Sequence, residues 1–281
     1  MKKENTQKIA TQRAVTSFPV RRMDYQFDNT SSKYWFKNDP ILTHYLTSYS
    51  TLFPEGEAYF VRSVRQLRSL VKNPILEKDI GAFIGQEAMH SKEHHAFHAS
   101  AEKYNLDPAA LEKITGVTLK TLEKYFPKKW NLLLTLGVEH YTAITASYMM
   151  SEAHKMISDD TIRNLWLWHS IEETEHKAVV FDIYQEIYGD DFSAYIPRVA
   201  MFTFSLILVN TLIHISLFSL IIKDKQMLNL KSWYNFFTFT SKGLSNFFPK
   251  ILDFYRLDFH PNHIDETSLV NLTKSKLSLS N

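Results

Sequence analysis

The chain has 281 residues, with 32 basic and 30 acidic side chains, a formal net charge of +2 and no cysteine. So small a net charge argues against nucleic acid as a partner. The absence of cysteine excludes disulfides, thiolate metal sites, iron–sulfur clusters and a cysteine nucleophile, so any metal must be held by histidine and carboxylate. Glycine occurs only seven times and forms no Gly-rich phosphate loop, which disfavours nucleotide chemistry.

The N-terminal part of the chain does not show a regular helical period. The first residues, MKKENTQKIATQR, are polar and lack the apolar core of a secretory signal. We therefore expect a frayed start and a catalytic part that remains in the cytoplasm. Residues 18–40 mix Pro, Asp, Asn and Ser with aromatic side chains, which predicts an irregular arm packed on the rest of the molecule.

A first helix is predicted over residues 40–70, with an interruption near Pro54, because proline lacks a backbone donor and clashes with the preceding turn. Glu57 follows this break directly. It shares its helix face with Phe60 and Val64, so it is a single carboxylate on an apolar stripe. Burying a lone ionised carboxylate is costly unless the group is paired or coordinates a metal.

A second helix should begin at Asn73, and it carries Glu87, His90 and His94 on one face, at spacings of three and four residues. Asp107 and the proline after it predict the start of a further helix within the connection that follows. This second helix therefore combines a Glu-x-x-His motif with an otherwise apolar stripe.

Two more helices complete the pattern. Residues 130–150 are strongly apolar, with Glu139 and His140 in the middle. The next helix should begin at residues 158–160 and end at Gly189, and it contains the stretch WLWHSIEETEHKAVVFDIY. There, His169, Glu173 and His176 follow one another at spacings of four and three residues and share one face, which gives a second Glu-x-x-His motif.

The order of these groups predicts the fold. A lone Glu on each of two helices, with a Glu-x-x-His motif on each of two others, is the ligand set of a two-metal carboxylate bundle. Glu57 precedes Glu87 by 30 positions and Glu139 precedes Glu173 by 34, which suits two antiparallel helix pairs, whereas the 49 positions from His90 to Glu139 suit a crossover. We therefore predict an all-α, ferritin-like four-helix bundle over residues 1–195. A buried network of ion pairs without metal is the alternative.

The segment after the bundle is unusually apolar. Residues 199–222 contain no charge over 24 positions, and a bilayer span needs about 20 apolar residues. Lys223, Lys225 and an aromatic cluster follow, as in a membrane interface. We expect a C-terminal hydrophobic helix within residues 196–225, either membrane-associated or buried as a core helix, and then an aromatic-rich segment with a polar tail over residues 226–281.

Six side chains are candidate metal ligands. Carboxylates bridge metals readily, each imidazole supplies one nitrogen, and such mixed sites suit iron or manganese, with zinc as a further candidate. We expect Glu87 and Glu173 to bridge the two metals and Glu57 and Glu139 to be terminal ligands. His90 and His176 would each hold one metal.

Three further histidines, His94, His140 and His169, are candidates for a seventh ligand, a proton relay or outer hydrogen-bond donors. We expect His95 and His98 at the surface. Three other acidic residues of the motif could orient imidazoles, but we expect them on solvated helix faces instead. They are Glu172, Glu175 and Asp182.

With these residues identified, the chain resembles the family of uncharacterised proteins called predicted metal-dependent hydrolases, whose members look ferritin-like. The resemblance covers residues 20–261. The strings that carry it are VRRMDYQF at Val20, FPEGEAYF at Phe53, FIGQEAMHSKEH at Phe83, GVEHYTA at Gly137, WLWHSIEETEHKAVVFDIY at Trp166 and DFHP at Asp258. It implies metal binding at the six candidate ligands, with His94, His140 and His169 as further motif histidines.

The arrangement of His169, Glu173 and His176 is also similar to the extra-histidine pattern of di-iron N-oxygenases, although such a likeness is an analogy. The favoured hypothesis is a di-iron enzyme that reduces dioxygen and oxidises a lipophilic small molecule, with electrons from a donor protein. The alternatives are a hydrolase that uses a metal-bridged water, and a non-catalytic metal-binding protein. The sequence leaves the oligomeric state open.

Overall fold

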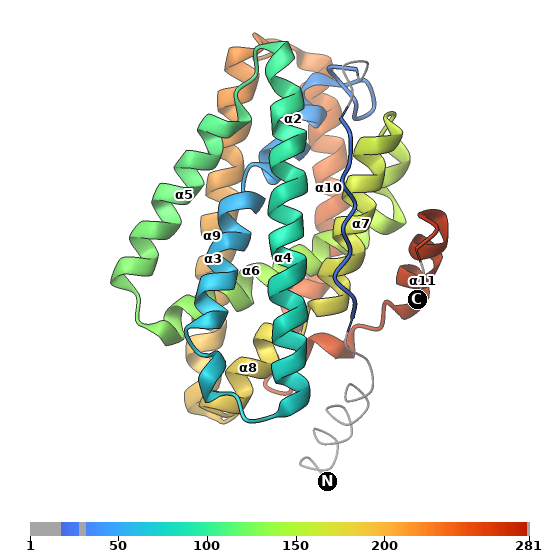
Figure 1. The fold of residues 1–281 in the computed structure, drawn as a ribbon. Helices are drawn as coiled ribbons and strands as arrows, with labels where there is room; N and C mark the ends of the chain where they lie inside the picture. Colours follow the sequence, from blue (N-terminus) through green and yellow to red (C-terminus); the bar gives the residue numbers. More distant parts are fainter. Residues whose placement is uncertain (1–17, 28–31, 280–281) are drawn as a thin grey trace.

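The computed structural model describes residues 18–27 and 32–279, and within these ranges the chain is helical, with an isolated bridge between Phe36 and Ile157 in place of any strand (Figure 1). The predicted all-α class is confirmed, whereas the frayed start lies outside the described residues. The α-helices are α2 (Pro40–Ser50), α3 (Phe53–Arg65), α4 (Pro74–Ala101), α5 (Pro108–Tyr125), α6 (Lys128–Ser151), α7 (Asp160–His176), α8 (Val179–Tyr188), α9 (Phe192–Lys223), α10 (Leu230–Asp253) and α11 (Thr267–Lys276). Short 3₁₀ turns occupy Arg68–Leu70, Glu102–Tyr104, Ala153–Met156 and Pro261–His263.

Local sequence signals explain where most of these helices begin. An Asp or Asn side chain accepts a hydrogen bond from a backbone N–H of the first turn, which satisfies one of the donors that a helix start leaves without a partner. The capping residues are Asp39, Asn73, Asp107, Asp159, Asp191 and Asn229. The predicted break near Pro54 is confirmed, because α2 ends at Ser50 and Pro54 occupies the first turn of α3.

Two segments differ from the expected elements. The helix that carries His176 does not run on to Gly189, since α7 ends at His176 and α8 begins at Val179. Neither proline nor glycine marks this interruption, so the sequence pattern gave no sign of it. The expected polar tail contains α11, which packs on α6 and α7.

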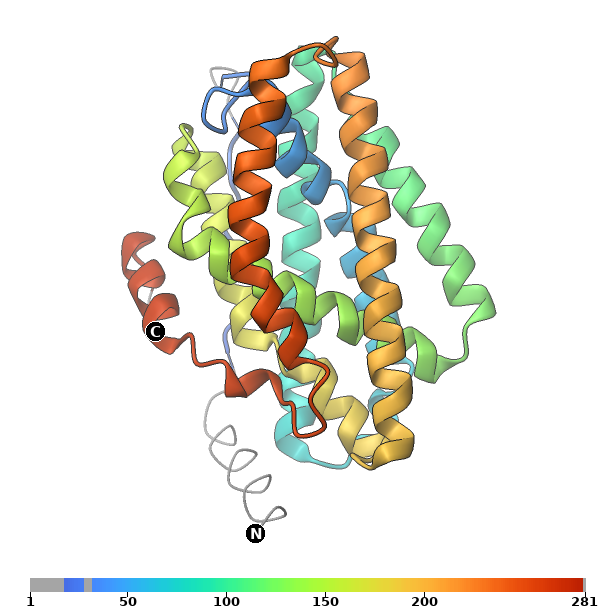
Figure 2. The ribbon, with the colours of Figure 1, turned by 180° about the vertical axis from the view of Figure 1, so that it is seen from behind.

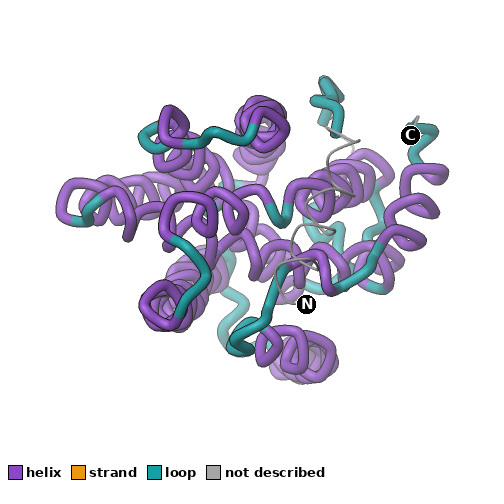
Figure 3. The backbone as a smooth tube through the Cα atoms, turned by 90° about the horizontal axis from the view of Figure 1, so that it is seen from below, coloured by secondary structure: helices purple, strands orange, loops and turns teal. Residues whose placement is uncertain are grey.

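The four helices that carry the candidate ligands form the centre of the molecule. Helix α3 packs on α4, α6 packs on α7, and further contacts join α3 to α6 and α4 to α7. Helix α5 runs along the outside and links α4 to α6 (Figure 1). Figure 2 shows α9 and α10 as a pair on the opposite side from α4, with α6 crossing beneath them. Figure 3 shows the same helices from below, joined by loops.

The candidate ligands occupy a layer between two apolar clusters. On α6, Leu132 and Leu136 belong to one cluster and Tyr141 to the other, with Glu139 between them. Helix α7 runs in the opposite direction. Its Trp168 belongs to the second cluster, His176 lies in the layer of candidate ligands, and α8, which follows, belongs to the first cluster. A buried polar layer inside an apolar core is expensive, so it needs a compensating partner.

The N-terminal arm covers one side of this layer. The Arg21 guanidinium pairs with Glu172 at 3.0 Å and with Glu175 at 2.7 Å. The backbone N–H groups of Asp24 and Tyr25 donate to the Glu93 carboxylate on α4. The predicted irregular arm packed on the bundle is therefore confirmed for residues 18–27.

Helix α9 is long and apolar enough to cross a membrane, and 44% of its most apolar window is buried in the molecule. Its buried face contacts α6 and α2, and it contributes Ile213, Leu217 and Ile221 to the core. The predicted hydrophobic helix is thus present, and it forms one wall of the molecule.

Candidate metal centre

Seven acidic and imidazole side chains from four helices meet in the central layer, and none is more than 3% exposed. They comprise the six candidate ligands together with one further histidine, and they are Glu57, Glu87, His90, Glu139, His169, Glu173 and His176. Their ligand atoms fall into groups of three that lie within 4.8 Å of one another, and these groups are Glu57, His90 and His169; Glu87, Glu139 and His176; and Glu87, His90 and Glu173.

The atom separations within these groups are those of ligands around an ion. The His176 Nε2 atom lies 3.3 Å from Glu87 Oε1 and 3.3 Å from Glu139 Oε2. On the other side, His90 Nδ1 lies 3.9 Å from Glu57 Oε1 and 3.8 Å from Glu87 Oε1. Metal–ligand bonds of about 2 Å place neighbouring ligands on one ion roughly this far apart. Two of the three ligand groups share Glu87, so the groups adjoin one another.

Glu173 is the central carboxylate of the layer. Its Oε1 atom lies 3.2 Å from His169 Nε2, 3.6 Å from His176 Nε2 and 3.7 Å from His90 Nδ1. Burial opposes its ionisation, but hydrogen bonds and positive charge from His169 and His176 outweigh burial and lower the pKa of Glu173. This carboxylate is therefore the one that stays ionised most readily in the layer.

Many ligand atoms of this layer are buried without a hydrogen-bond partner. Buried polar side-chain atoms normally have such a partner, so a concentration of exceptions needs an explanation. Within the described part of the chain, the atoms without one include Glu57 Oε1, both oxygens of Glu87 and both oxygens of Glu139. Glu57, Glu87 and Glu139 each contribute an oxygen to the groups of close ligand atoms, as the donors of a cation site would.

Each imidazole in the layer has a different partner for its outer nitrogen. The His176 Nδ1 atom donates to the amide oxygen of Gln86 at 2.9 Å, and its Nε2 atom faces the carboxylates. The His90 Nε2 atom lies 3.1 Å from Glu172 Oε2, and His169 Nδ1 is hydrogen-bonded to His94 at 2.8 Å. Outer partners of this kind orient imidazoles in metal sites.

The protonation of the layer shows why it needs positive charge. Burial, and then the neighbouring carboxylates, raise the pKa of Glu57 and of Glu87 well above the ordinary range, and the same causes raise that of Glu139 to about 7. Burial lowers the pKa of His90 to about 3 and that of His169 to about 4. His90 and His169 are thus neutral near pH 7, as metal ligands must be. At His176, the Glu139 and Glu173 carboxylates outweigh burial and raise the pKa well above its ordinary value, so this imidazole must lose a proton before its Nε2 atom binds a metal. A cation would favour ionisation of the carboxylates.

His94 lies outside the seven-residue group and begins a hydrogen-bonded chain to the surface. Its Nδ1 atom is 2.6 Å from Ser50 Oγ, which is 2.6 Å from His98 Nε2, and His98 in turn bonds Glu112. Glu112 also contacts His95 at 3.0 Å, and the His95 side chain is 58% exposed. The expected surface position of His95 is confirmed, but the one for His98 is wrong, because Ser50 and Glu112 enclose it.

The structure does not bring His140 to the layer. Its ring packs among Phe202, Phe254 and Phe259, with ring centroids 5.4, 4.8 and 4.9 Å away. Adjacent residues on a helix point about 100° apart, so Glu139 and His140 cannot face the same volume. Burial lowers the pKa of His140 to about 3, so it is a neutral core side chain.

Sequence reasoning missed two outer partners. Glu172 was expected on a solvated face, but it is fully buried because the N-terminal arm covers it, and its second carboxylate oxygen accepts from Arg21. Gln86 carries no charge and therefore gave no signal. Asp182 contacts His260 at 2.8 Å, away from the layer, and Glu175 is held by Arg21 and by Lys274.

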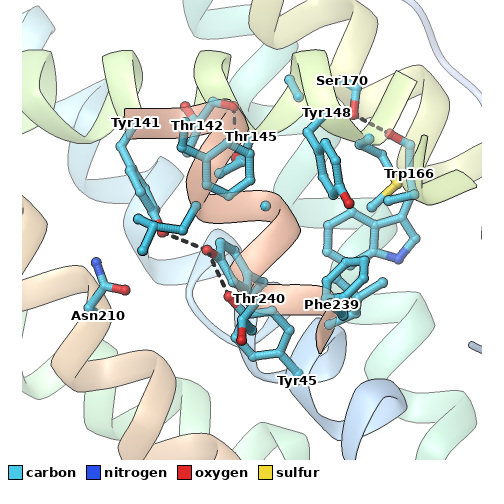
Figure 4. Close-up of a pocket in the computed structure, with 18 of the residues that line it drawn as sticks. Tyr45, Tyr141, Thr142, Thr145, Tyr148, Trp166, Ser170, Asn210, Phe239 and Thr240 are labelled. Atoms are coloured by element: carbon cyan, nitrogen blue, oxygen red, sulfur yellow. Dashed lines mark hydrogen bonds between the residues drawn. The ribbon is translucent and has the colours of Figure 1, made fainter. Parts of the chain in front are cut away.

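A cavity of about 450 Å³ adjoins the layer and is lined by Glu173 and His169 at its inner end. Its walls come mainly from α2, α6, α7, α9 and α10, with Phe53 of α3, and are largely aromatic and aliphatic. Figure 4 shows side chains converging on it from several helices, with Tyr141 and Thr142 from α6 and Phe239 from α10. A small apolar molecule therefore fits beside the candidate metal centre.

The fold and the site together define an all-α protein with a buried cluster of carboxylates and imidazoles that suits metal ions. The chain belongs to the family described as predicted metal-dependent hydrolase, whose sequence model matches residues 19–265. Comparisons with curated proteins and with solved structures gave no match. The resemblance to this family is thus confirmed, whereas the ferritin-like topology and the likeness to di-iron N-oxygenases stay predictions.

Proposed function

We propose that this protein is a two-metal enzyme acting on an apolar small molecule. One ion would be held by Glu57, His90 and His169, and the other by Glu139 and His176, with Glu87 and Glu173 shared between them. The carrying observation is the set of buried ligand atoms without hydrogen-bond partners. A network of ion pairs without metal uses some of these atoms, since His176 Nε2 lies 3.3 Å from Glu87 and from Glu139, but it leaves four buried carboxylates to share few positive charges. A metal centre is therefore favoured over that alternative.

The favoured reaction is oxidation of the apolar molecule by dioxygen. A ligand set of carboxylates and imidazoles suits iron or manganese, and bound ferrous ions would supply electrons to dioxygen. Glu173 and His169 line the inner end of the cavity, so a molecule bound there would lie against the centre, and the apolar walls would exclude water. Repeated turnover with insertion of one oxygen atom needs two external electrons, so this reaction includes an electron-donor protein.

Hydrolysis is the second candidate, and the family description favours it. Two redox-inert ions at the same positions would polarise a carbonyl or phosphoryl group and activate a water molecule between them. The site geometry serves this chemistry as well, since the two ligand groups adjoin each other. The two candidates therefore differ in the source of the oxygen atom in the product.

Metal content tests the site itself. Protein purified without oxygen should hold about two ions per chain, and Glu87→Ala and Glu173→Ala should each lose both together, because these carboxylates are shared. The matched control is His140→Leu, which changes a buried histidine of α6 outside the layer and should keep the full metal content. A chain that binds no iron, manganese or zinc on reconstitution would refute the proposal.

Isotope labelling separates the reactions. The metal-loaded protein is incubated with a panel of apolar amines and esters, under labelled dioxygen or in labelled water. Label from dioxygen in the product supports oxidation, and label from water with no oxygen uptake supports hydrolysis. Full metal content with neither reaction would favour a non-catalytic metal-binding protein.

A further inference from the structure

Helices α9 and α10 each present an apolar stripe to solvent. On α9, residues at spacings of three to eight positions are 37–63% exposed, and they are Phe204, Ile207, Ile215, Phe218 and Ile222. On α10, corresponding residues are 54–79% exposed, and they are Leu230, Tyr234, Phe237, Leu244 and Phe248. We call these ten residues the α9–α10 face. Contiguous exposed apolar patches mark contacts with partners or membranes.

The charges around this face are basic. Residues 199–252 contain a single acidic residue, Asp224, whose side chain is only 7% exposed and which is held by Lys33 and His44. The exposed lysines of the segment are Lys223, Lys225, Lys231 and Lys242. Two copies of the chain joined through this face would bring like charges together, whereas anionic lipid headgroups would complement them.

The cavity beside the candidate metal centre opens on the same face. Among its described lining residues, the exposed ones belong to α9 and α10, and they are His214, Phe237, Ser241 and Leu244. A shallow groove between Ile207 and Phe218 shares Asn210 and His214 with the cavity. The mouth of the cavity is therefore surrounded by exposed apolar side chains.

The buried side of α9 decides how this face could meet a bilayer. Ile213 and Leu217 are fully buried in the core, and Ser205 contacts the backbone of α6. A spanning position would require α9 to leave these contacts and expose the core. An apolar face with basic residues beside it instead suits a helix pair lying in the plane of the membrane interface.

We propose that the α9–α10 face docks on the surface of a membrane containing anionic phospholipid, with the mouth of the cavity facing the lipid. The inference of docking is argued from the exposed apolar residues and lysines of α9 and α10, without the proposed function. Only the consequence, that a lipophilic substrate enters from the membrane, rests on the proposed function.

The experiment uses the full-length protein and vesicles of phosphatidylcholine, with or without phosphatidylglycerol. Flotation should recover the protein with the mixed vesicles, and added salt should weaken binding. The double variant Lys223→Gln, Lys225→Gln should bind more weakly by about fivefold for each lysine removed. Phe218→Ser combined with Phe237→Ser should also release the protein, whereas Leu272→Ser, at an exposed position on α11, should not.

The orientation of the docked protein on the vesicle is tested by fluorescence. Because the chain has no cysteine of its own, a single introduced cysteine can be labelled selectively. An environment-sensitive dye on Leu244→Cys should shift to shorter wavelength when mixed vesicles are added, and the same dye on Leu272→Cys should not. No flotation with either vesicle, or a discrete dimer that the Phe218→Ser, Phe237→Ser variant dissociates, would overturn the proposal. Vesicle binding does not need metal, so metal-free protein separates a failure of docking from a failure of the proposed function.

Discussion

The clearest quantitative prediction concerns the pH dependence of metal binding. A metal binds ionised carboxylates, so any proton on the cluster must leave first. Burial and neighbouring charge raise the pKa of Glu139 to about 7, and those of Glu57 and Glu87 are raised well above the ordinary value. Affinity should therefore increase as pH rises through 7.

The magnitude follows from Glu139 alone. With a pKa of about 7, this carboxyl group is about one-tenth ionised at pH 6 and about nine-tenths ionised at pH 8, so affinity should rise about tenfold between these values. Protonation of Glu57 and Glu87 adds to this ratio with the same sign, and so does protonation of His176, whose pKa the Glu139 and Glu173 carboxylates raise well above the ordinary value despite burial. His90 and His169, with pKa values of about 3 and 4, are neutral throughout this range and contribute nothing to it.

Manganese is a suitable probe, because the free aqueous ion is measured directly by electron paramagnetic resonance. Metal-free protein is titrated with Mn²⁺ at pH 6, 7 and 8. The matched variant Glu139→Gln carries no titrating group at this position, so it should bind more weakly and show a pH ratio about tenfold smaller than the parent. Equal affinity at pH 6 and pH 8, or an unchanged ratio in Glu139→Gln, would refute the reasoning.

Two further predictions concern stability. In Gly137→Ala, the added Cβ would lie 2.5 Å from Ser205 Oγ and 3.2 Å from the Phe202 backbone on α9. The free energy of unfolding, measured in urea, should therefore fall by about 1–3 kcal/mol. The control Gly81→Ala meets only an ordinary contact and should be neutral or slightly stabilising. Arg21→Met would leave the buried Glu172 carboxylate without its guanidinium partner, so urea unfolding should show a loss of about 3 kcal/mol. A loss below about 1 kcal/mol would contradict this prediction.

Local patterns predicted the helices and which of their faces are buried, because a Glu and a His three or four positions apart share one face wherever the helix packs. Helix geometry also separates His169, which shares a face with Glu173, from His140, which is adjacent to Glu139 and points about 100° away from it. Only the packing of α6 shows that Glu139 faces the layer and His140 faces Phe254. The buried position of Glu172 was beyond sequence reasoning for a related reason, as it depends on the distant arm that carries Arg21.

The apolar helix α9 illustrates a second limit. A segment that is apolar on every side gives no period from which a buried face can be chosen. The structure buries Ile213 and Leu217 and exposes Ile207 and Ile215, although all four are aliphatic. Three-dimensional packing, rather than residue type, therefore decides which side of this helix meets solvent.

The hydrogen-bonded chain from His169 to His95 reaches water between α4 and α5, whereas the mouth of the cavity opens between α9 and α10. Helix α4, which carries His95, lies on the opposite side from α9 and α10, as Figures 1 and 2 show, whereas α5 runs beside α9. A molecule resting in the cavity would therefore not block exchange of hydrogen ions between the buried layer and the solvent. The buried layer thus has two separate connections to the surface, an apolar cavity lined by α9 and α10 and a chain of polar side chains that ends at His95.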